Sequence, residues 1–132
     1  MADLETARSL FKKEFGFLES RFEIYEVPAH GAREAEGEHI WKPGAYVLYH
    51  PDFGILKVGR HLTNARKRAL DHIRDNTGAG EPFEMKAMGA DPRTRLMLFV
   101  VKDEKKDWHW PAALEIYLER ELEPRIRSKR AG

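Results

Sequence analysis

The sequence predicts a small α+β domain built on a mostly antiparallel sheet. Apolar residues recur every three or four positions in three separate segments, which is the spacing of one buried helical face. Two apolar segments flank the turn-forming residues Pro51 to Gly54, as in a β-hairpin. A further segment, Arg95 to Lys102, is apolar on both sides, which is typical of a central strand. The resulting order is helix, hairpin, helix, strand and helix.

Length and composition exclude several classes of protein. The 132 residues suffice for one domain with a terminal extension, and 42% hydrophobic and 34% charged residues are typical of a folded chain with a charged surface. The longest apolar run, Leu96 to Val101, has six residues, so we expect no membrane span. The absence of cysteine excludes disulfides, zinc–thiolate sites and cysteine nucleophiles, and favours the reducing cytoplasm. The net charge of +1 gives no general reason to expect nucleic acid binding.

The N-terminal part of the chain is predicted to form an extension that packs on the core. Apolar positions from Leu4 to Leu18 follow helical spacing. The mixed stretch Phe22 to Val27 is compatible with a strand, and His30 to His39 is polar and contains glycine, as loops do. We therefore divide the chain into a helix and loop extension, residues 1–40, and a domain that carries the chemistry, residues 41–132.

Capping residues and prolines delimit the later helices. Thr63 or Asn64 is suited to cap a helix after the hairpin. Pro111 is suited to the first turn of a last helix, and Pro124 ends that helix. The core-facing positions predicted for these two helices are Ala65, Ala69, Leu70, Ile73, Leu114, Tyr117, Leu118 and Leu122.

The hairpin brings two polar side chains onto one face. A four-residue turn pairs His50 with Ile55. The same register places Gly59 opposite Tyr46, where it leaves space open. Tyr46 and Lys57 then lie diagonally, ~7–8 Å apart between α-carbons. A phenol and an ammonium at this spacing can converge on one small group such as a phosphate.

Three more residues lie at the flanks of the apolar helix faces. Arg68 and His72 are four residues apart, so they lie one above the other on the same helix. Glu115 lies in the first turns of the last helix, where a carboxylate can hold a divalent cation. Each candidate also has a structural alternative. Tyr46 can be a packing tyrosine, Arg68 and Glu115 can be solvated surface charges, and His72 can cover the core.

Positive charge is concentrated around these residues. Between positions 57 and 74 there are six basic residues and one acid, a local charge of +5. A phosphate backbone is the ligand that such a cluster attracts. The basic residues are Lys57, Arg60, Arg66, Lys67, Arg68 and Arg74, and we expect Arg60, His61, Arg66, Lys67 and Arg74 to contact nucleic acid. Four basic residues near the C-terminus extend this track or form a solubilising tail: Arg125, Arg127, Lys129 and Arg130.

These residues resemble the motifs of the GIY-YIG nuclease family. Gly44–Tyr46 corresponds to the first triplet and Lys57–Gly59 to the second, with the usual ten residues between them. Arg68 and His72 keep the family's arginine-to-histidine spacing. The run LEIYLERELEPRI resembles the metal-binding helix, in which a proline follows the glutamate, here Glu115, after nine residues. The resemblance covers roughly residues 41–127.

The resemblance implies a three-stranded antiparallel sheet flanked by helices. It also implies hydrolysis of DNA phosphodiester bonds with one divalent ion, Mg²⁺ or Mn²⁺. In that activity Tyr46 orients or deprotonates the attacking water, and Arg68 binds the scissile phosphate. Glu115 ligates the metal, and His72 shuttles a proton or holds the phosphate.

Three departures from the family pattern involve four residues. Lys57 occupies the place of the second tyrosine, where it acts either as a neutral base or as a charged phosphate anchor. Arg127 stands where many members have an asparagine. Arg60 and His61 follow Gly59 where a small or hydroxyl residue is common, and they bring extra positive charge.

The function that the sequence favours is therefore a metal-dependent DNA endonuclease. No separate recognition region is evident, so we expect a homodimer or a partner protein to supply sequence specificity. The alternative is a catalytically weak or inactive nucleic-acid-binding module of the same fold. A plain interaction domain would leave the charge cluster unexplained.

Overall fold

The computed structural model describes residues 2–128. Four strands form one sheet with the order β1-β4-β2-β3, and every neighbouring pair is antiparallel. The strands are β1 (Phe22–Pro28), β2 (Gly44–His50), β3 (Gly54–His61) and β4 (Arg95–Val101). The helices are α1 (Leu4–Phe15), α2 (Ala65–Arg74), α3 (Met85–Ala90), α4 (Glu104–Asp107) and α5 (Trp110–Leu122), with short 3₁₀ segments η1 (Gly16–Arg21) and η2 (Ala32–Glu34).

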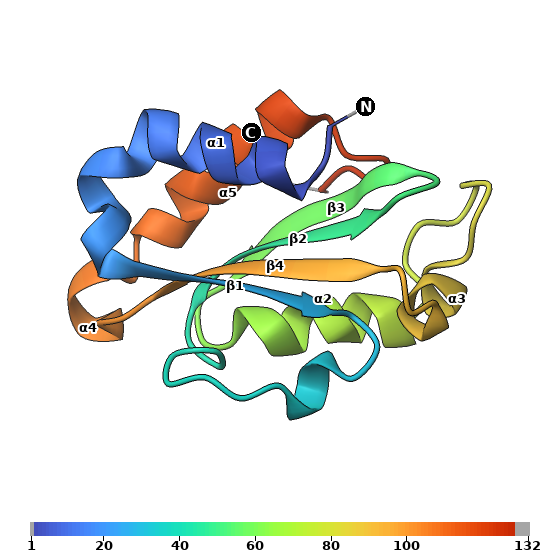
Figure 1. Cartoon of the computed structure of the whole chain (residues 1–132), viewed down its shortest axis with the longest axis horizontal. Helices are drawn as coiled ribbons and strands as arrows, with labels where there is room; N and C mark the ends of the chain where they lie inside the picture. The colour runs from blue at the N-terminus through green and yellow to red at the C-terminus, as the bar shows by residue number, and fades with distance from the viewer. Residues whose placement is uncertain (1, 129–132) are drawn as a thin grey trace.

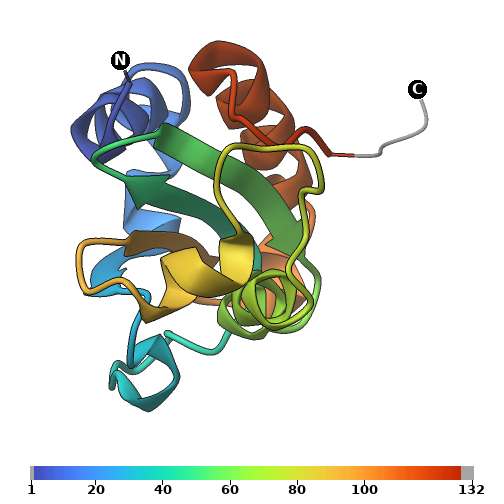
Figure 2. The ribbon, with the colours of Figure 1, turned by 90° about the vertical axis from the view of Figure 1, so that its right-hand side faces the viewer.

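The sheet is the middle layer of three. Helices α1 and α5 cover one face, and α2 and α3 cover the other (Figures 1 and 2). Strand β2 supplies both layers because its side chains alternate: Ala45 and Val47 belong to the core under α1 and α5. Tyr46 and Leu48 belong to the core that also contains buried residues of α2 and α3. The predicted α+β class and the antiparallel sheet are confirmed.

The sheet has four strands, so the expectation of three is wrong. Phe22–Pro28 pairs with β4 along its whole length, from Phe22 opposite Val101 to Pro28 opposite Arg95. Only Phe22 of this strand is buried, and the other residues are partly or fully exposed. A strand in such surroundings needs no strict alternation of apolar and polar residues. Strand β4 lies between β1 and β2 and is buried on both faces, as a central strand must be.

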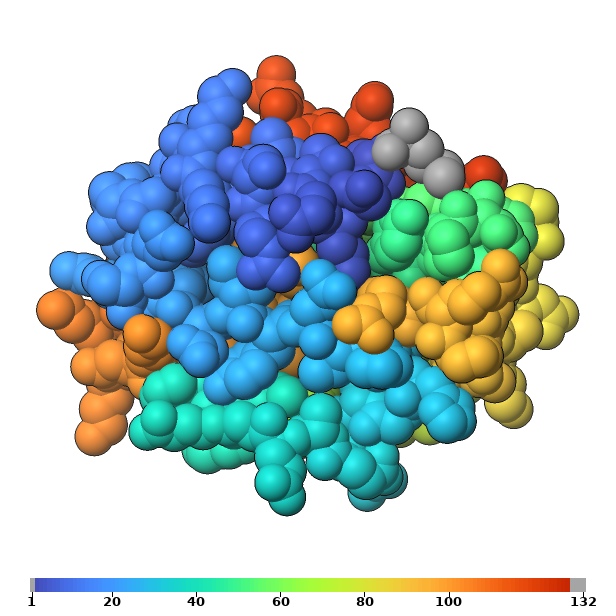
Figure 3. Space-filling model, viewed as in Figure 1, coloured from blue at the N-terminus to red at the C-terminus, as the bar shows by residue number. Residues whose placement is uncertain are grey.

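The N-terminal residues share their hydrophobic core with the rest of the chain. Leu4, Ala7 and Phe11 of α1 pack in one cluster with Phe99 of β4 and Leu114 of α5. In the space-filling view, α1, β1 and the loop that follows (blue to cyan) form much of the visible face (Figure 3). No helix within the described residues is long and apolar enough to cross a membrane.

The β2–β3 hairpin contains a β-bulge that preserves the predicted register beyond the turn. His50 pairs with Gly54, so the pairing of His50 with Ile55 is wrong and the turn is one residue shorter. Gly54 adopts φ of 80°, a conformation that favours glycine. Leu56 has no partner on β2, and this extra residue restores the offset.

Beyond the bulge the pairs are those expected. Leu48 lies opposite Lys57, and Tyr46 lies opposite Gly59. Tyr46 and Lys57 therefore share a face of the sheet.

The chain after α5 returns along the free edge of β3. Glu123 adopts a left-handed conformation, with φ of 48°, and ends the helix before Pro124. The Arg125 and Ile126 N–H groups then donate to the carbonyls of Ile55 (3.0 Å) and Leu56 (2.9 Å). Ile126 forms a parallel bridge with Lys57. This C-terminal segment, residues 125–128, partly covers an edge strand that would otherwise expose its backbone groups.

A polar network joins the tip of the hairpin to the turn before β4. Buried His50 lies 2.7 Å from Asp91 through its Nε2, and its Nδ1 accepts the Asp52 N–H at 3.1 Å. Arg93 bridges the carboxylates of Asp52 and Asp91, because its Nη2 lies 3.1 Å from an oxygen of each. The hydrogen bonds from Arg93, followed by the one from His50, lower the pKa of Asp91 well below its usual range.

We expect Asp91→Asn to lower the melting temperature at pH 7. A lowered pKa in the folded state stabilises the fold above the unfolded value of about 3.9, and this contribution is lost as the pH falls below it. The difference between wild type and variant should therefore shrink between pH 7 and pH 2.5 in thermal unfolding followed by circular dichroism. Asp75→Asn, at an exposed pair with Arg74, is the control. A difference that does not change with pH contradicts this role of Asp91.

Candidate active site

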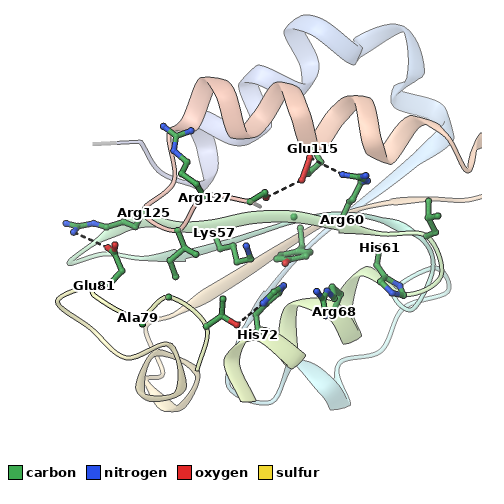
Figure 4. A pocket seen from close by; sticks show the side chains of 17 residues that line it. Lys57, Arg60, His61, Arg68, His72, Ala79, Glu81, Glu115, Arg125 and Arg127 are labelled. Atoms are coloured by element: carbon green, nitrogen blue, oxygen red, sulfur yellow. Dashed lines mark hydrogen bonds and ion pairs between the residues drawn. The ribbon is translucent and has the colours of Figure 1, made fainter. Parts of the chain in front are cut away.

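A pocket of about 830 Å³ lies at the β3 edge of the sheet. Its wall includes β2 and β3, α2, α5, the loop after α2 and the C-terminal segment. The five residues predicted as catalytic all line it: Tyr46, Lys57, Arg68, His72 and Glu115. Figure 4 shows Arg60 and Glu115 on the side of α5, while His72 and Arg68 approach from α2.

The hairpin contributes two deeply buried members of the site. Tyr46 is 1% exposed and Lys57 is 5% exposed. The ring of Tyr46 lies directly against Gly59, and a Cβ atom at that glycine would collide with the phenol oxygen and ring carbons. Gly59 was expected to leave open space, but the phenol itself fills that space.

The Tyr46 phenol is a neutral group at physiological pH. Burial raises its pKa above the ordinary value, an effect that Arg68 opposes and Glu115 and Glu119 reinforce. The phenol can therefore orient a water by hydrogen bonding, whereas removing its proton is costly.

Helix α2 presents Arg68 to the pocket. Within residues 2–128 the Arg68 guanidinium makes no hydrogen bond or ion pair. The nearby carboxylates form ion pairs with other basic residues. Asp71 pairs with Lys67 (3.1 Å) and Arg74 (3.3 Å), and Asp75 at the end of the helix pairs with Arg74 (3.1 Å). Arg68 is thus a cation available to an anionic ligand.

His72 lies beside Tyr46, with 6.3 Å between the ring centroids. Its Nδ1 is 2.9 Å from the Thr77 hydroxyl. Burial, followed by the charges of Lys57 and Arg68, lowers the pKa of His72 to about 4. The imidazole is therefore neutral near pH 7 and able to accept a proton.

Helix α5 contributes one carboxylate to the pocket wall, Glu115, and a second, Glu119, just behind it. Glu115 is 2% exposed and Glu119, one turn later, is 5% exposed. Arg60 Nη1 lies 3.4 Å from Glu115 Oε1. The Ser128 hydroxyl lies 3.3 Å from the Val58 carbonyl oxygen and 3.5 Å from Glu115 Oε2, and the Ser128 N–H donates to Glu119 Oε1 (2.7 Å). Glu115 is thus a buried and hydrogen-bonded group, which excludes a freely solvated surface charge.

Ser128 and Glu119 were not among the predicted site residues. Glu119 follows Glu115 by four residues, so helical spacing alone could have placed it on the same flank. Ser128 gave no signal in the sequence. Its position depends on the pairing of the C-terminal segment with β3, which joins residues about 70 positions apart.

The predicted nucleic-acid contacts fall into two groups. Arg60 and His61 line the pocket, although His61 also accepts the Asn64 N–H (3.1 Å) at its Nδ1 and thereby braces the turn before α2. Arg66, Lys67 and Arg74 line a second hollow of about 440 Å³, which also includes Arg33. Lys129 and Arg130 lie outside the described residues.

Arg66 has a further, structural role in this second hollow. Its guanidinium donates to the Ala32 and Ala35 carbonyls, at 3.2 and 2.9 Å. It therefore holds the loop around η2 against α2.

The main pocket is electropositive overall. Five cationic side chains line it against two carboxylates. The cations are Lys57, Arg60, Arg68, Arg125 and Arg127, and the carboxylates are Glu81 and Glu115. An anion is the ligand that this balance favours.

The pocket contains one acidic residue placed to hold a metal ion. No group of three or more His, Asp or Glu residues within the described part of the chain could hold one. Mg²⁺ in phosphate-processing sites usually takes one or two carboxylates together with waters and substrate phosphates. Glu115, a buried carboxylate on the wall of an electropositive pocket, fits such a site.

We expect Gly59→Ala to displace the Tyr46 ring. The added methyl group overlaps the phenol, and overpacking of this kind costs about 1–3 kcal/mol. Urea denaturation should show that loss of stability, and Gly16→Ala, where a Cβ meets no atom within 4 Å, is the control. Equal stability of Gly59→Ala and wild type would contradict this packing.

We expect His72 to titrate at about pH 4 in an NMR titration of the imidazole C–H signals. The folded pKa lies below the unfolded value of about 6.5, so neutral His72 favours the fold fully above pH 6.5 and less as the pH falls towards 4. His72→Gln assigns the signal and should remove this part of the acid sensitivity. A midpoint near 6.5 would mean that the ring is solvated.

Comparisons with protein-family models, with curated proteins and with solved structures gave no match to this chain.

Proposed function

We propose that the chain is a divalent-metal-dependent endonuclease that hydrolyses DNA phosphodiester bonds at a GIY-YIG-type site. The observation that carries the proposal is the meeting of three groups from separate elements in one pocket: the Tyr46 phenol, the Arg68 guanidinium and the Glu115 carboxylate. Phosphodiester hydrolysis needs a positioned water, charge compensation at the phosphate and stabilisation of the leaving oxygen. The pocket contains a candidate for each need.

The phosphate is held by cations from two elements. Arg68 of α2 has no partner among the described residues, so its guanidinium can bind two phosphate oxygens at once. Lys57 of β3 lines the same pocket and acts as a second, charged anchor for the phosphate. Lys57 in this role needs no proton transfer.

The attacking water is handled by Tyr46 and His72. The raised pKa of Tyr46 keeps the phenol protonated, so it positions the water by a hydrogen bond. His72 is the candidate to take up the proton that the water loses, because its imidazole is neutral near pH 7; its lowered pKa makes it a weaker base than an ordinary histidine. Thr77 fixes the orientation of the imidazole.

Glu115 is the residue that would hold Mg²⁺ or Mn²⁺. When bound, such an ion supplies Lewis acidity and a positive charge near the leaving oxygen. Ser128 and Arg60 hold the Glu115 carboxylate at the pocket wall. We keep the cytoplasm as the expected compartment, and a homodimer or partner protein as the expected source of sequence specificity.

The second candidate function is a DNA-binding module with little or no catalysis. Two observations favour it: Lys57 replaces the second motif's tyrosine, and Arg60 already occupies the carboxylate that would bind metal. Both candidate functions require phosphate contacts, so both predict DNA binding that weakens as salt rises. Only the endonuclease predicts cleavage of DNA.

We expect the purified protein to nick supercoiled plasmid with Mg²⁺ or Mn²⁺. Glu115→Ala and Arg68→Ala should each reduce the rate about a hundredfold or more, because each removes a group that stabilises the transition state. Arg120→Ala and Glu121→Ala, at exposed positions of α5, are the matched controls and should cleave like wild type.

Two other results would change the assignment. Absence of cleavage with any metal, together with DNA binding that weakens as salt rises, supports the binding module. Binding that does not depend on salt contradicts phosphate contacts and both candidate functions.

A further inference from the structure

The ion pair between Arg60 and Glu115 joins two residues of unlike exposure. Glu115 is 2% exposed at its side chain, whereas the Arg60 side chain is 36% exposed. Their charged groups approach within 3.4 Å at the wall of the pocket, and Figure 4 shows them directed toward one another from β3 and α5. The carboxylate is anchored on a helix and further held by Ser128, so the guanidinium is the partner that can move.

This pair places a positive charge where a metal ion would bind. A divalent cation at Glu115 repels the guanidinium, because both are positively charged and compete for the same carboxylate. Binding of the ion therefore competes with the Arg60 contact to Glu115 Oε1. This competition weakens metal binding unless Arg60 gains another anion.

A DNA phosphate supplies that anion. Arg60 lines the same pocket as Lys57 and Arg68, the two residues proposed to hold the phosphodiester. A guanidinium forms paired hydrogen bonds with phosphate oxygens as readily as with a carboxylate. Arg60 can thus exchange one oxyanion for another while its charge stays compensated.

We propose that Arg60 holds Glu115 when the protein is free and transfers to a DNA phosphate when substrate binds, so that metal binding is coupled to DNA binding. The inference rests on the proposed function and adds a coupling to it: the site binds its metal ion more tightly when DNA is bound. By linkage, the factor by which DNA tightens metal binding equals the factor by which metal tightens DNA binding.

The test measures Mn²⁺ binding and needs no cleavage. Free Mn²⁺ is followed by electron paramagnetic resonance for wild type, Arg60→Gln and Arg60→Lys. Each protein is titrated alone and with a short phosphorothioate DNA duplex. Arg127→Gln is the matched control, because it removes a charge from the same pocket and leaves the Arg60–Glu115 pair intact.

Without DNA, Arg60→Gln should bind Mn²⁺ about tenfold more tightly than wild type, since a charge-assisted contact no longer competes. Arg60→Lys should stay close to wild type, and Arg127→Gln should gain less than about threefold from the general change in potential. The duplex should tighten Mn²⁺ binding by a larger factor in wild type than in Arg60→Gln. Arg60→Met, which keeps the length of the aliphatic stem, repeats the measurement if Arg60→Gln fails to fold.

Three results would overturn the coupling: equal Mn²⁺ affinity of wild type and Arg60→Gln, an equal gain in Arg127→Gln, or an equal effect of the duplex on both proteins. Failure of the proposed function is distinguishable from these. A protein that shows the expected Mn²⁺ pattern but cleaves no DNA retains the coupling and lacks the activity. A protein that binds no Mn²⁺ under any condition has neither the coupling nor a metal-dependent site.

Discussion

The register between β2 and β3 is the constraint on which the site depends. Tyr46 lies opposite Gly59, and Lys57 lies opposite Leu48, only because the extra residue at Leu56 compensates for the short turn. A shift by one residue would move Lys57 to the face covered by α5 and remove it from Tyr46. The buried phenol in turn requires glycine at position 59, since any side chain there overlaps the ring. The hairpin therefore sets both the chemistry of the pocket and its shape.

The pocket also concentrates charge where burial is costly. Lys57, Glu115 and Glu119 are each at most 5% exposed, and each has interaction partners within the chain. Desolvation of ionised groups usually offsets most of the stabilisation that their pairing provides. A core of apolar residues would hold β3, α5 and the C-terminal segment together at least as well. Stability alone therefore does not account for these buried charges, and the proposed function gives them a role.

Arg60 and Arg68 illustrate two different states of a cation in one site. Arg68 has no partner among the described residues and faces the pocket from a rigid helix, whereas Arg60 is paired with the proposed metal ligand. Under the proposed function, a phosphate in the pocket would be attracted by both cations, and only Arg60 would exchange an ion pair on binding it. The second hollow, with Arg33, Lys67 and Arg74, extends positive charge along the other flank of α2.

Local sequence patterns were sufficient to predict the α+β class, the central strand and a cap of α2 at Thr63 or Asn64. The structure selects Asn64, whose side chain accepts the Lys67 N–H at 3.0 Å. The expectation that Tyr46, Arg68 and Glu115 share one site came from the resemblance to the GIY-YIG motifs, because the three residues lie on separate elements and local spacing does not relate them; all three line the pocket. Local patterns did not predict that Phe22–Pro28 would become a fourth strand of the sheet, since its mixed pattern does not specify a strand and its pairing partner β4 lies about 70 residues later in the chain. Tertiary structure alone decided the pairing of Arg60 with Glu115, the neutral state of His72 and the contact of Ser128 with Glu115. Each of these depends on burial and on approach between distant segments, and no local pattern encodes either.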